Sequence, residues 1–114
     1  MDMTPTDDST LAEAASTFAA LGSEQRLGVL RTLVRAGPDG LSIGELGARS
    51  GVTGSTLTHH MKILSAADLV RQVREGRRII CIAAAYARMK SLSEFLLTDC
   101  CADSSHPHKD HRHG

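Results

Sequence analysis

The side chains with the most distinctive chemistry in this sequence are its three cysteines, Cys81, Cys100 and Cys101. In a cytoplasmic protein an odd number of cysteines favours free thiols over structural disulfides. Cys100 and Cys101 are adjacent, and a trans peptide holds their Cα atoms about 3.8 Å apart, below the roughly 4.4 Å minimum of ordinary disulfides. Both thiols are therefore expected to stay available. Because paired thiolates bind soft ions, the candidate ligands are trivalent arsenic or antimony, mercury, zinc and copper(I).

Cys81 is the candidate for a third ligand. It precedes a predicted helix over residues 84–98, whereas Cys100 follows that helix, which separates the two by about 20–25 Å at about 1.5 Å per residue. One chain cannot close such a site alone, but antiparallel helices in a dimer would bring Cys81 of one chain toward Cys100 of the other. Otherwise Cys101 or a tail histidine completes the ligand set. In that case Cys81 is a small buried hydrophobic side chain of the core.

The tail histidines are a second group of possible ligands. Neutral imidazoles bind zinc, nickel or copper. Their irregular spacing also fits a solubilising tail, and both interpretations stay open. These residues are His106, His108, His111 and His113.

The elements that position such groups are predicted from residues 41–80. This segment is typical of a short helix, a tight turn, a second helix and a basic hairpin, which is the order of a winged helix-turn-helix. Gly51 can adopt the left-handed conformation that ends a helix, and Val52 is expected to enter the core. Thr53 is predicted to cap the second helix with its hydroxyl. The first helix is expected to bury Ile43, Leu46 and Ala48.

The second helix of this pair has two distinct faces. Leu57, Met61 and Leu64 recur at the spacing of an apolar face, and short polar side chains with one cation lie opposite, as contacts with base edges and phosphates require. An ordinary solvated face is the alternative, and the adjoining turn and hairpin favour DNA. His60 lies beside the apolar face and is predicted to pack or hydrogen-bond inside the protein. The candidate DNA-contacting residues are Ser55, Thr56, Thr58, His59 and Lys62.

A basic hairpin is predicted to follow. Residues 70–74 and 77–82 are rich in β-branched side chains, and Glu75-Gly76 between them is the expected turn. Arginines cluster on this ribbon, and the planar guanidinium binds two phosphate oxygens at once. Protection of a sheet edge by charge is an alternative that is compatible with DNA contact. The arginines are Arg71, Arg74, Arg77 and Arg78, of which the last three are the candidates for DNA contact.

Charge is distributed unevenly along the chain. Overall, 13 Lys and Arg residues balance 13 Asp and Glu residues. Residues 62–90, however, contain seven basic and two acidic residues, whereas residues 1–24 contain five acidic residues and no basic ones. The positive charge therefore coincides with the predicted DNA-reading region.

A single domain is expected from 114 residues, of which 41% are hydrophobic and 3% aromatic. Further helices are predicted over residues 10–21, from residue 23 to the stop at Gly37-Pro38, and over residues 84–98. The apolar stripes of the first and last helices favour a homodimer over packing within one chain. The expected apolar faces are Leu11, Ala14, Ala15 and Phe18, then Leu27, Leu30, Leu33 and Val34, then Ala85, Met89, Leu92 and Leu96.

The predicted organisation has three parts. Residues 1–9 are expected to be a disordered acidic N-terminus, residues 10–98 a DNA-binding and dimerisation domain, and residues 99–114 a flexible tail with Cys and His. No apolar run is long enough to span a membrane, and the first residues are unlike a secretory signal, so a cytoplasmic protein without membrane partners is expected. We expect no enzyme, because no arrangement of nucleophile, base and oxyanion donors is visible, and no permanently bound cofactor.

With these residues in view, the chain resembles the ArsR/SmtB family of dimeric repressors, which release DNA on binding a metal or metalloid ion. The resemblance covers residues 19–97. In the second helix of the predicted pair, the recognition helix, Thr58, His60 and Met61 fill places of the family pattern. The chain departs from the pattern at Asp68, where the family usually has Gly, and at Cys81, where it more often has Tyr. The segments that carry the resemblance are LGSEQRLGVLRTL, SIGELGARSGVTGSTLTHHMKILSAADLV and REGRRIICI.

This resemblance implies a winged helix-turn-helix fold in which Ser55, Thr58 and His59 read bases and the arginines of the hairpin contact the DNA backbone. Thr-Asp-Cys-Cys after the last helix resembles the arsenic-responsive members, whose cysteine pair ends that helix. The family's other common sensor site uses Asp and His pairs on the last helix. Residues 84–98 contain neither residue type, so that zinc site is expected to be absent.

Three functional hypotheses follow. The first is an operator-binding repressor that is released by a soft metal or metalloid ion at the cysteines, an ion that must in turn bind the DNA complex less tightly. The second keeps the repressor but replaces the ion with thiol oxidation or a persulfide bridge between Cys81 and Cys100 or Cys101. The third is a metal-buffering or protein-interaction module.

Overall fold

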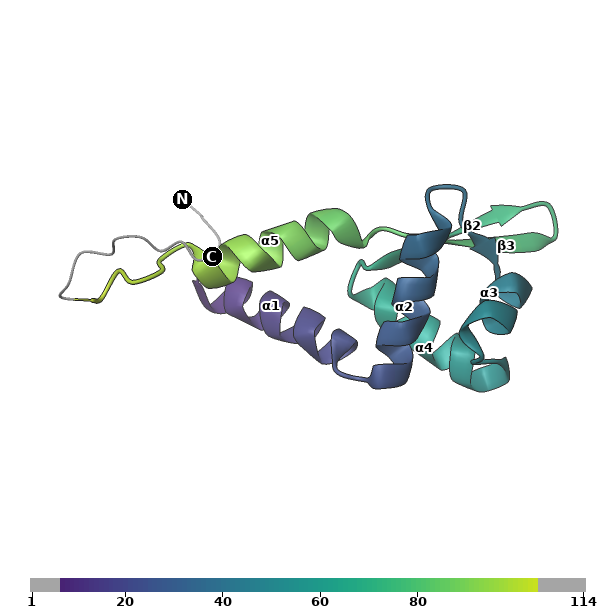
Figure 1. The fold of residues 1–114 in the computed structure, drawn as a ribbon, viewed down its shortest axis with the longest axis horizontal. Coiled ribbons are helices and arrows are strands. Elements are labelled where there is room, and N and C mark those ends of the chain that lie inside the picture. Colours follow the sequence, from purple (N-terminus) through teal and green to yellow (C-terminus); the bar gives the residue numbers. More distant parts are fainter. Residues whose placement is uncertain (1–6, 105–114) are drawn as a thin grey trace.

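The computed structural model describes residues 7–104. Within them five helices accompany a three-stranded antiparallel sheet of strand order β1-β3-β2 (Figure 1). The predicted fold class, mainly α with a small β-hairpin in a winged helix-turn-helix, is confirmed. The elements are α1 (Asp7–Leu21), α2 (Glu24–Ala36), β1 (Leu41–Ser42), α3 (Ile43–Ser50), α4 (Gly54–Ala66), β2 (Val70–Glu75), β3 (Arg78–Ala83) and α5 (Ala85–Leu97).

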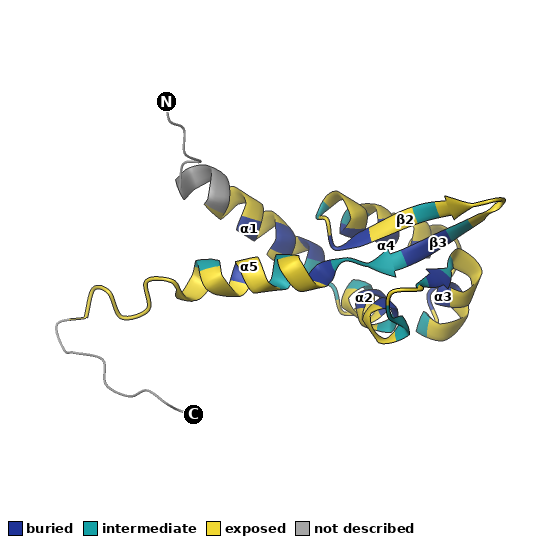
Figure 2. Ribbon diagram, turned by 90° about the horizontal axis from the view of Figure 1, so that it is seen from above, coloured by how far each residue is buried: buried dark blue, intermediate teal, exposed yellow. Residues whose placement is uncertain are grey.

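The core lies where α2, α3 and α4 meet the sheet (Figure 2). Leu33, Leu46 and Leu64 are completely buried in it. Because full burial of a leucine side chain stabilises a protein by about 1.5–3 kcal/mol, such residues hold the three helices together on the sheet. The prediction of the buried apolar face of α2 is partly wrong, since Leu27 and Val34 are exposed. Val29 is buried in the core with Leu30 and Leu33 instead.

Helix α3 turns a different side inward from the one predicted. Leu46 is buried as expected, but Ile43 and Ala48 are exposed, and Gly47 is buried in their place. The reason is close packing in the turn, because a Cβ on Gly47 would lie only 3.3 Å from the Val52 carbonyl oxygen. Such an approach suits a residue without a side chain, and it draws this side of α3 toward α4.

Local hydrogen bonds set the limits of the helix-turn-helix. The Ser42 hydroxyl accepts from the Glu45 N–H at 3.1 Å, and the Glu45 carboxylate accepts from the Ser42 N–H at 2.8 Å, which forms a capping box at the start of α3. Gly51 ends α3 in the predicted left-handed conformation, with φ of 78°. Thr53 lies at the N-cap of α4, but within residues 7–104 its hydroxyl makes no capping hydrogen bond, contrary to prediction. Gly54 follows with φ of +64°, so the first turn departs from the geometry that a cap needs.

The wing is the hairpin of β2 and β3. Its register pairs Val70 with Ala83 and Glu75 with Arg78, so the loop is Gly76-Arg77, one residue later than predicted. Gly76 takes the first loop position with φ of +64°, which suits a two-residue turn that needs glycine first. Strand β1 was not predicted, because a strand of two residues carries no periodicity. It pairs with Cys81 and Ile80 of β3.

Helices α1 and α5 extend from the end of the body opposite the wing (Figure 1). Helix α1 begins at Asp7, so residues 7–9 are helical and the predicted disorder of residues 1–9 is wrong for these three. The predicted apolar faces are only partly covered, and the large exposed side chains on the two helices are Leu11, Phe18, Tyr86, Leu96 and Leu97.

The chain continues beyond α5 as a series of turns. The Cys100 N–H donates to the Leu97 carbonyl at 3.0 Å, and the Ala102 N–H donates to the Asp99 carbonyl at 2.9 Å. The predicted flexible tail therefore has hydrogen-bonded turns as far as residue 104. The four tail histidines lie outside the described residues.

Candidate nucleic-acid interface and thiol pair

The exposed face of α4 has the composition predicted for DNA contact. Leu57, Met61 and Leu64 are buried beneath it, as their spacing predicted. Hydroxyl groups, an imidazole and an ammonium group therefore project from the helix surface, and each can donate or accept at a base edge or a phosphate. The exposed residues are Ser55, Thr56, Thr58, His59 and Lys62.

A groove of about 550 Å³ lies between α4 and the wing. Thr58 and Lys62 line it from the helix, and Gln72 and Ile79 line it from the sheet. Polar groups thus reach the groove from both walls. A phosphate backbone placed in it would meet a cation on one wall and an amide on the other.

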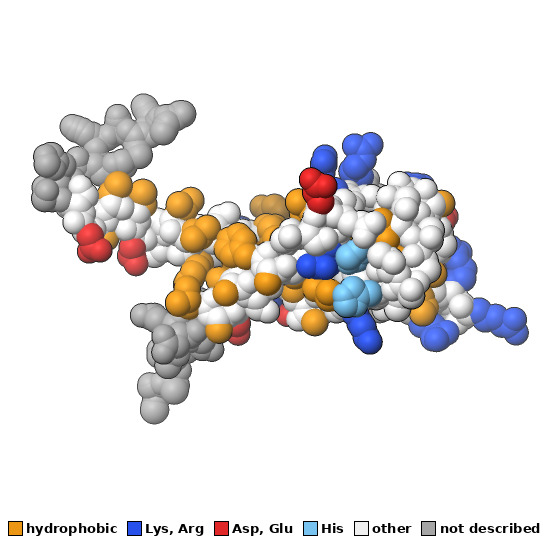
Figure 3. Space-filling model, turned by 90° about the horizontal axis from the view of Figure 1, so that it is seen from below, with side chains coloured by type: hydrophobic (Ala, Val, Ile, Leu, Met, Phe, Trp, Pro, Cys, Tyr) orange, Lys and Arg blue, Asp and Glu red, His pale blue; other side chains and the backbone are white. Residues whose placement is uncertain are grey.

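The wing carries the arginines predicted for backbone contact. Arg74, Arg77 and Arg78 are all exposed. Lys and Arg side chains project from the molecule at the hairpin end, whereas hydrophobic side chains are more frequent along the opposite arm (Figure 3). This separation of charge from apolar surface matches the uneven charge found in the sequence.

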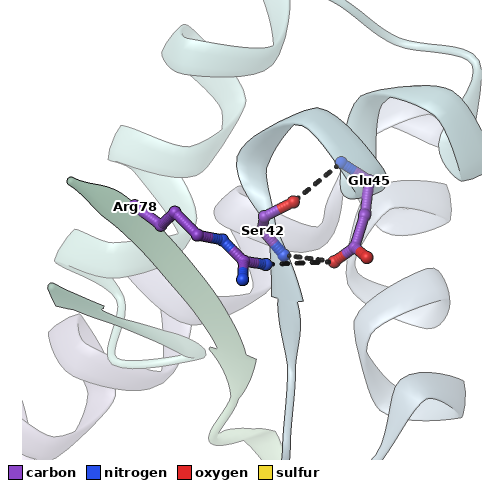
Figure 4. A network of polar contacts seen from close by, with 3 residues as sticks. All are labelled: Ser42, Glu45 and Arg78. Carbon is purple, nitrogen blue, oxygen red and sulfur yellow. Dashed lines mark hydrogen bonds and ion pairs between the residues drawn. The ribbon is translucent and has the colours of Figure 1, made fainter. Parts of the chain in front are cut away.

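One wing arginine contacts the helix-turn-helix. Arg78 Nη2 lies 3.9 Å from Glu45 Oε1, the oxygen that also accepts the Ser42 N–H (Figure 4). Hydrogen bonds from Ser42, the backbone one first, hold the pKa of Glu45 below its usual value, and the charge of Arg78 adds to them. Both side chains of the ion pair are more than half exposed, so the attraction is weak and leaves Arg78 able to bind a phosphate.

The start of the wing contains the departure from the family pattern at Asp68. This residue has φ of 61°, a conformation that suits the usual glycine and that Asp tolerates better than most residues. Arg88 of α5 donates to its Oδ2 at 3.0 Å. The left-handed backbone expected of the usual glycine is therefore kept. In addition, the Asp68 carboxylate links the start of the wing to α5.

His60 is buried, as predicted, with 7% of its surface exposed. Its Nε2 lies 2.9 Å from Gln25 Oε1, and its Nδ1 lies 3.4 Å from Arg26 Nη1. Sequence reasoning did not identify Gln25 or Arg26, because they are 35 and 34 residues away in the chain. The only signal was that Arg26 lies in LGSEQRLGVLRTL, one of the segments that carry the family resemblance, and that His60 fills a place of the family pattern.

The adjacent cysteines form an exposed pair of free thiols. Their Sγ atoms lie 3.7 Å apart, and both side chains are open to solvent. The hydrogen bond with Cys100 raises the pKa of the Cys101 thiol. The pair therefore presents two sulfur atoms to one side of the chain end, close enough to bind the same ion.

Cys81 has a different environment. It is completely buried in the core on β3, where it pairs with Leu41 and Gln72 across the sheet. Burial raises the pKa of its thiol. It lies before α5 and the exposed pair lies after it (Figure 1), so the structure does not bring the three sulfurs together within one chain.

Comparison with known proteins decides the family. A helix-turn-helix domain family matches residues 21–73. The chain is 35% identical over 77 residues to YceK of Bacillus subtilis, an uncharacterised HTH-type transcriptional regulator, and the match covers 68% of this chain and 73% of that protein. An ArsR-like transcriptional regulator from Rhodococcus has the same fold, with a TM-score of 0.67 and 32% identity over 82% of this chain and 84% of the other.

The chain belongs to the ArsR-like family of helix-turn-helix transcriptional regulators. A further fold relative is the winged helix-turn-helix domain of Mb0332 from Mycobacterium bovis, described as homodimeric. It is 22% identical, covers 94% of this chain and all of that domain (100%), and has a TM-score of 0.65.

Two negative findings apply to those residues of this ArsR-like regulator that the structure describes. They contain no group of three or more His, Cys, Asp or Glu side chains placed to hold a metal ion. None of their helices is long and apolar enough to cross a membrane.

Proposed function

We propose that this ArsR-like regulator is a dimeric repressor that places α4 in the major groove of double-stranded operator DNA and the wing on neighbouring phosphates. The observation that carries the proposal is the exposed polar face of α4 beside an arginine-bearing hairpin, with a groove between them. In this arrangement Ser55, Thr58 and His59 contact base edges, and Lys62 contacts the backbone. The other contacts come from Thr56, Arg74, Arg77 and Arg78.

The homodimer is supported by the exposed apolar side chains of α1 and α5. Phe18 is 44% exposed and Leu96 is 61% exposed, and several large apolar side chains exposed on the same two helices are typical of an interaction surface. The homodimeric state of the Mb0332 domain, which has the same fold, agrees with this assembly. A twofold axis would present two α4 helices to two half-sites about one turn of DNA apart.

Replacing Leu96 with Glu tests the dimer. We expect the variant to sediment as a monomer at micromolar concentration and to bind its operator more weakly, because two carboxylates would have to be buried at the interface. Leu11→Glu on α1 is a second variant for the same measurement. Sedimentation of the wild-type chain as a monomer would contradict the proposal.

The inducer that we propose is trivalent arsenic or antimony, bound by Cys100 and Cys101. The exposed sulfurs, 3.7 Å apart, support this choice, and thiolates also suit mercury, zinc and copper(I). Each As–S bond that forms with arsenous acid releases one hydroxide of the acid and one thiol proton as water. A third ligand from Cys81 would require that residue to leave the core, so the exposed pair is the main site.

The experiment is a titration of the purified chain on labelled DNA from its own promoter. Under reducing conditions we expect tight, sequence-selective binding that arsenite and antimonite weaken by about 5–150-fold, the usual range of allosteric coupling. Cys100→Ser and Cys101→Ser should each lose this response, and Cys81→Ala, which keeps a small apolar side chain in the core, should retain it. A full response in both serine variants would show that the site is elsewhere.

Thiol oxidation is a second candidate for the signal, favoured by the exposure of both sulfurs of the pair. Here an oxidant or persulfide without metal would release the DNA, and a reductant would restore binding. A bridge from Cys81 to the pair would again require its removal from the core. The same promoter titration, with metal chelated and oxidant added, separates this candidate from ion binding.

A further inference from the structure

A set of side-chain contacts joins α1, a proposed dimerisation helix, to α4, the proposed recognition helix. Arg26, at the start of α2, donates through Nε to the Ala20 carbonyl and through Nη2 to the Ala19 carbonyl, at 3.3 Å for the latter. Both carbonyls belong to the last turn of α1. The same guanidinium reaches His60 of α4 through Nη1. One side chain therefore connects the end of α1 with the middle of the recognition helix.

The partners of His60 determine where its proton lies. An arginine side chain only donates, so the Nδ1 atom facing Arg26 must be the unprotonated, accepting nitrogen. The proton of the neutral ring is then on Nε2, which donates to Gln25 Oε1 at 2.9 Å. Both ring nitrogens are satisfied in this state, and α4 is held against α2 at a point between its buried leucines.

Protonation of His60 is incompatible with this arrangement. A proton on Nδ1 would point an N–H at the N–H of Arg26 and place two positive charges about one hydrogen bond apart. A second titratable group near the ring is His59, whose ring centroid lies 5.9 Å away and which is also basic. Burial is the main cause that lowers the pKa of His60 below its usual value, and Arg26 and His59 add to it.

We propose that Arg26 and His60 are positioning residues for DNA binding, which set the orientation of α4 relative to α1 only while the His60 ring is neutral. In a dimer built on α1 and α5, the position of each α4 relative to α1 determines where the two recognition helices meet the operator. This inference rests on the proposed DNA-binding function. Its consequence is a repressor that loses operator affinity on acidification.

The direction of the pH effect follows from the lowered pKa. The unfolded chain takes up a proton near pH 6.5, whereas the folded chain resists protonation of His60. The stabilisation that the neutral ring provides is therefore complete above about pH 6.5 and disappears as the pH falls below it. Proton uptake by exposed groups close to the DNA acts in the opposite direction, since added positive charge strengthens binding to phosphates.

The test compares operator affinity at pH 8.0 and pH 5.5 for the wild type and His60→Asn. Asparagine can offer its amide oxygen at the place of Nδ1 and cannot be protonated. We expect wild-type affinity to fall about tenfold between pH 8.0 and pH 5.5, which corresponds to about 1.4 kcal/mol, and the affinity of His60→Asn to change much less over the same range. His59→Asn is expected to bind more weakly at both pH values, because His59 faces the bases, but the further loss on going from pH 8.0 to pH 5.5 should remain.

A second measurement does not depend on the variant folding. In the wild-type protein, imidazole nitrogen chemical shifts measured by NMR should show His60 as the Nε2–H tautomer, with a pKa below 6.5. An Nδ1–H tautomer, or the same pH profile for wild type and His60→Asn, would overturn the positioning role. Failure of the wild type to bind any promoter DNA at pH 8.0 would contradict the proposed function itself.

Discussion

Removing the three wing arginines is expected to weaken operator binding by at least about a hundredfold at physiological salt, because phosphate contacts supply much of the affinity of such complexes. The variant combines Arg74→Ala, Arg77→Ala and Arg78→Ala. All three side chains are exposed, so the fold should be little affected. The slope of log affinity against log salt should fall by about one for each phosphate that the variant no longer binds. Fluorescence anisotropy over a range of salt concentrations measures both quantities.

Lys90→Ala is the matched control for this variant. Lys90 is an exposed cation on α5, away from the wing, so its removal tests the effect of charge alone. We expect a small change in affinity and the same salt slope. A wing variant that kept the wild-type slope would show that the hairpin does not contact phosphates. Loss of selective binding in Arg77→Ala and in His59→Ala would, in turn, exclude a module that binds only protein or metal.

Gly40→Ala is expected to destabilise the domain by about 2–5 kcal/mol, with about 3 kcal/mol as the central value, since a left-handed backbone costs about 1–2 kcal/mol and overpacking about 1–3 kcal/mol. Gly40 has φ of +71°, and a Cβ there would lie 2.4 Å from the Cys81 carbonyl oxygen and 2.8 Å from Ile82 Cγ1. The carbonyl belongs to the central strand and cannot move aside. Thermal unfolding should show a Tm about 12–24 °C lower.

Gly28→Ala provides the comparison. Gly28 lies inside α2, and a Cβ there would have open space around it within the described part of the chain. This substitution should raise the free energy of unfolding by about 0.8–1 kcal/mol, the difference in helix propensity between the two residues. Equal Tm values for Gly40→Ala and wild type would mean that the loop before β1 relaxes without cost.

The parts of the site that were predicted correctly depend on local signals. The polar face of α4 follows from the helical repeat, and the end of α3 follows from the conformational freedom of Gly51. The wing was found from its β-branched residues and its glycine turn, although the loop lies one residue later because only Gly76 suits the first position. The Thr53 cap failed because Gly54, the first residue of α4, has a positive φ, which no side-chain pattern reveals.

By itself, the sequence determined which residues lie on each face of the recognition helix, where the arginines gather and that two cysteines are neighbours, since these depend on spacing along one element. Only the tertiary structure decided that Arg26 meets His60, that Cys81 lies in the core away from Cys100, and that Gly40 touches the central strand. Such contacts join segments far apart in the chain. They are set by how the helices and the sheet pack together, which local periodicity does not encode.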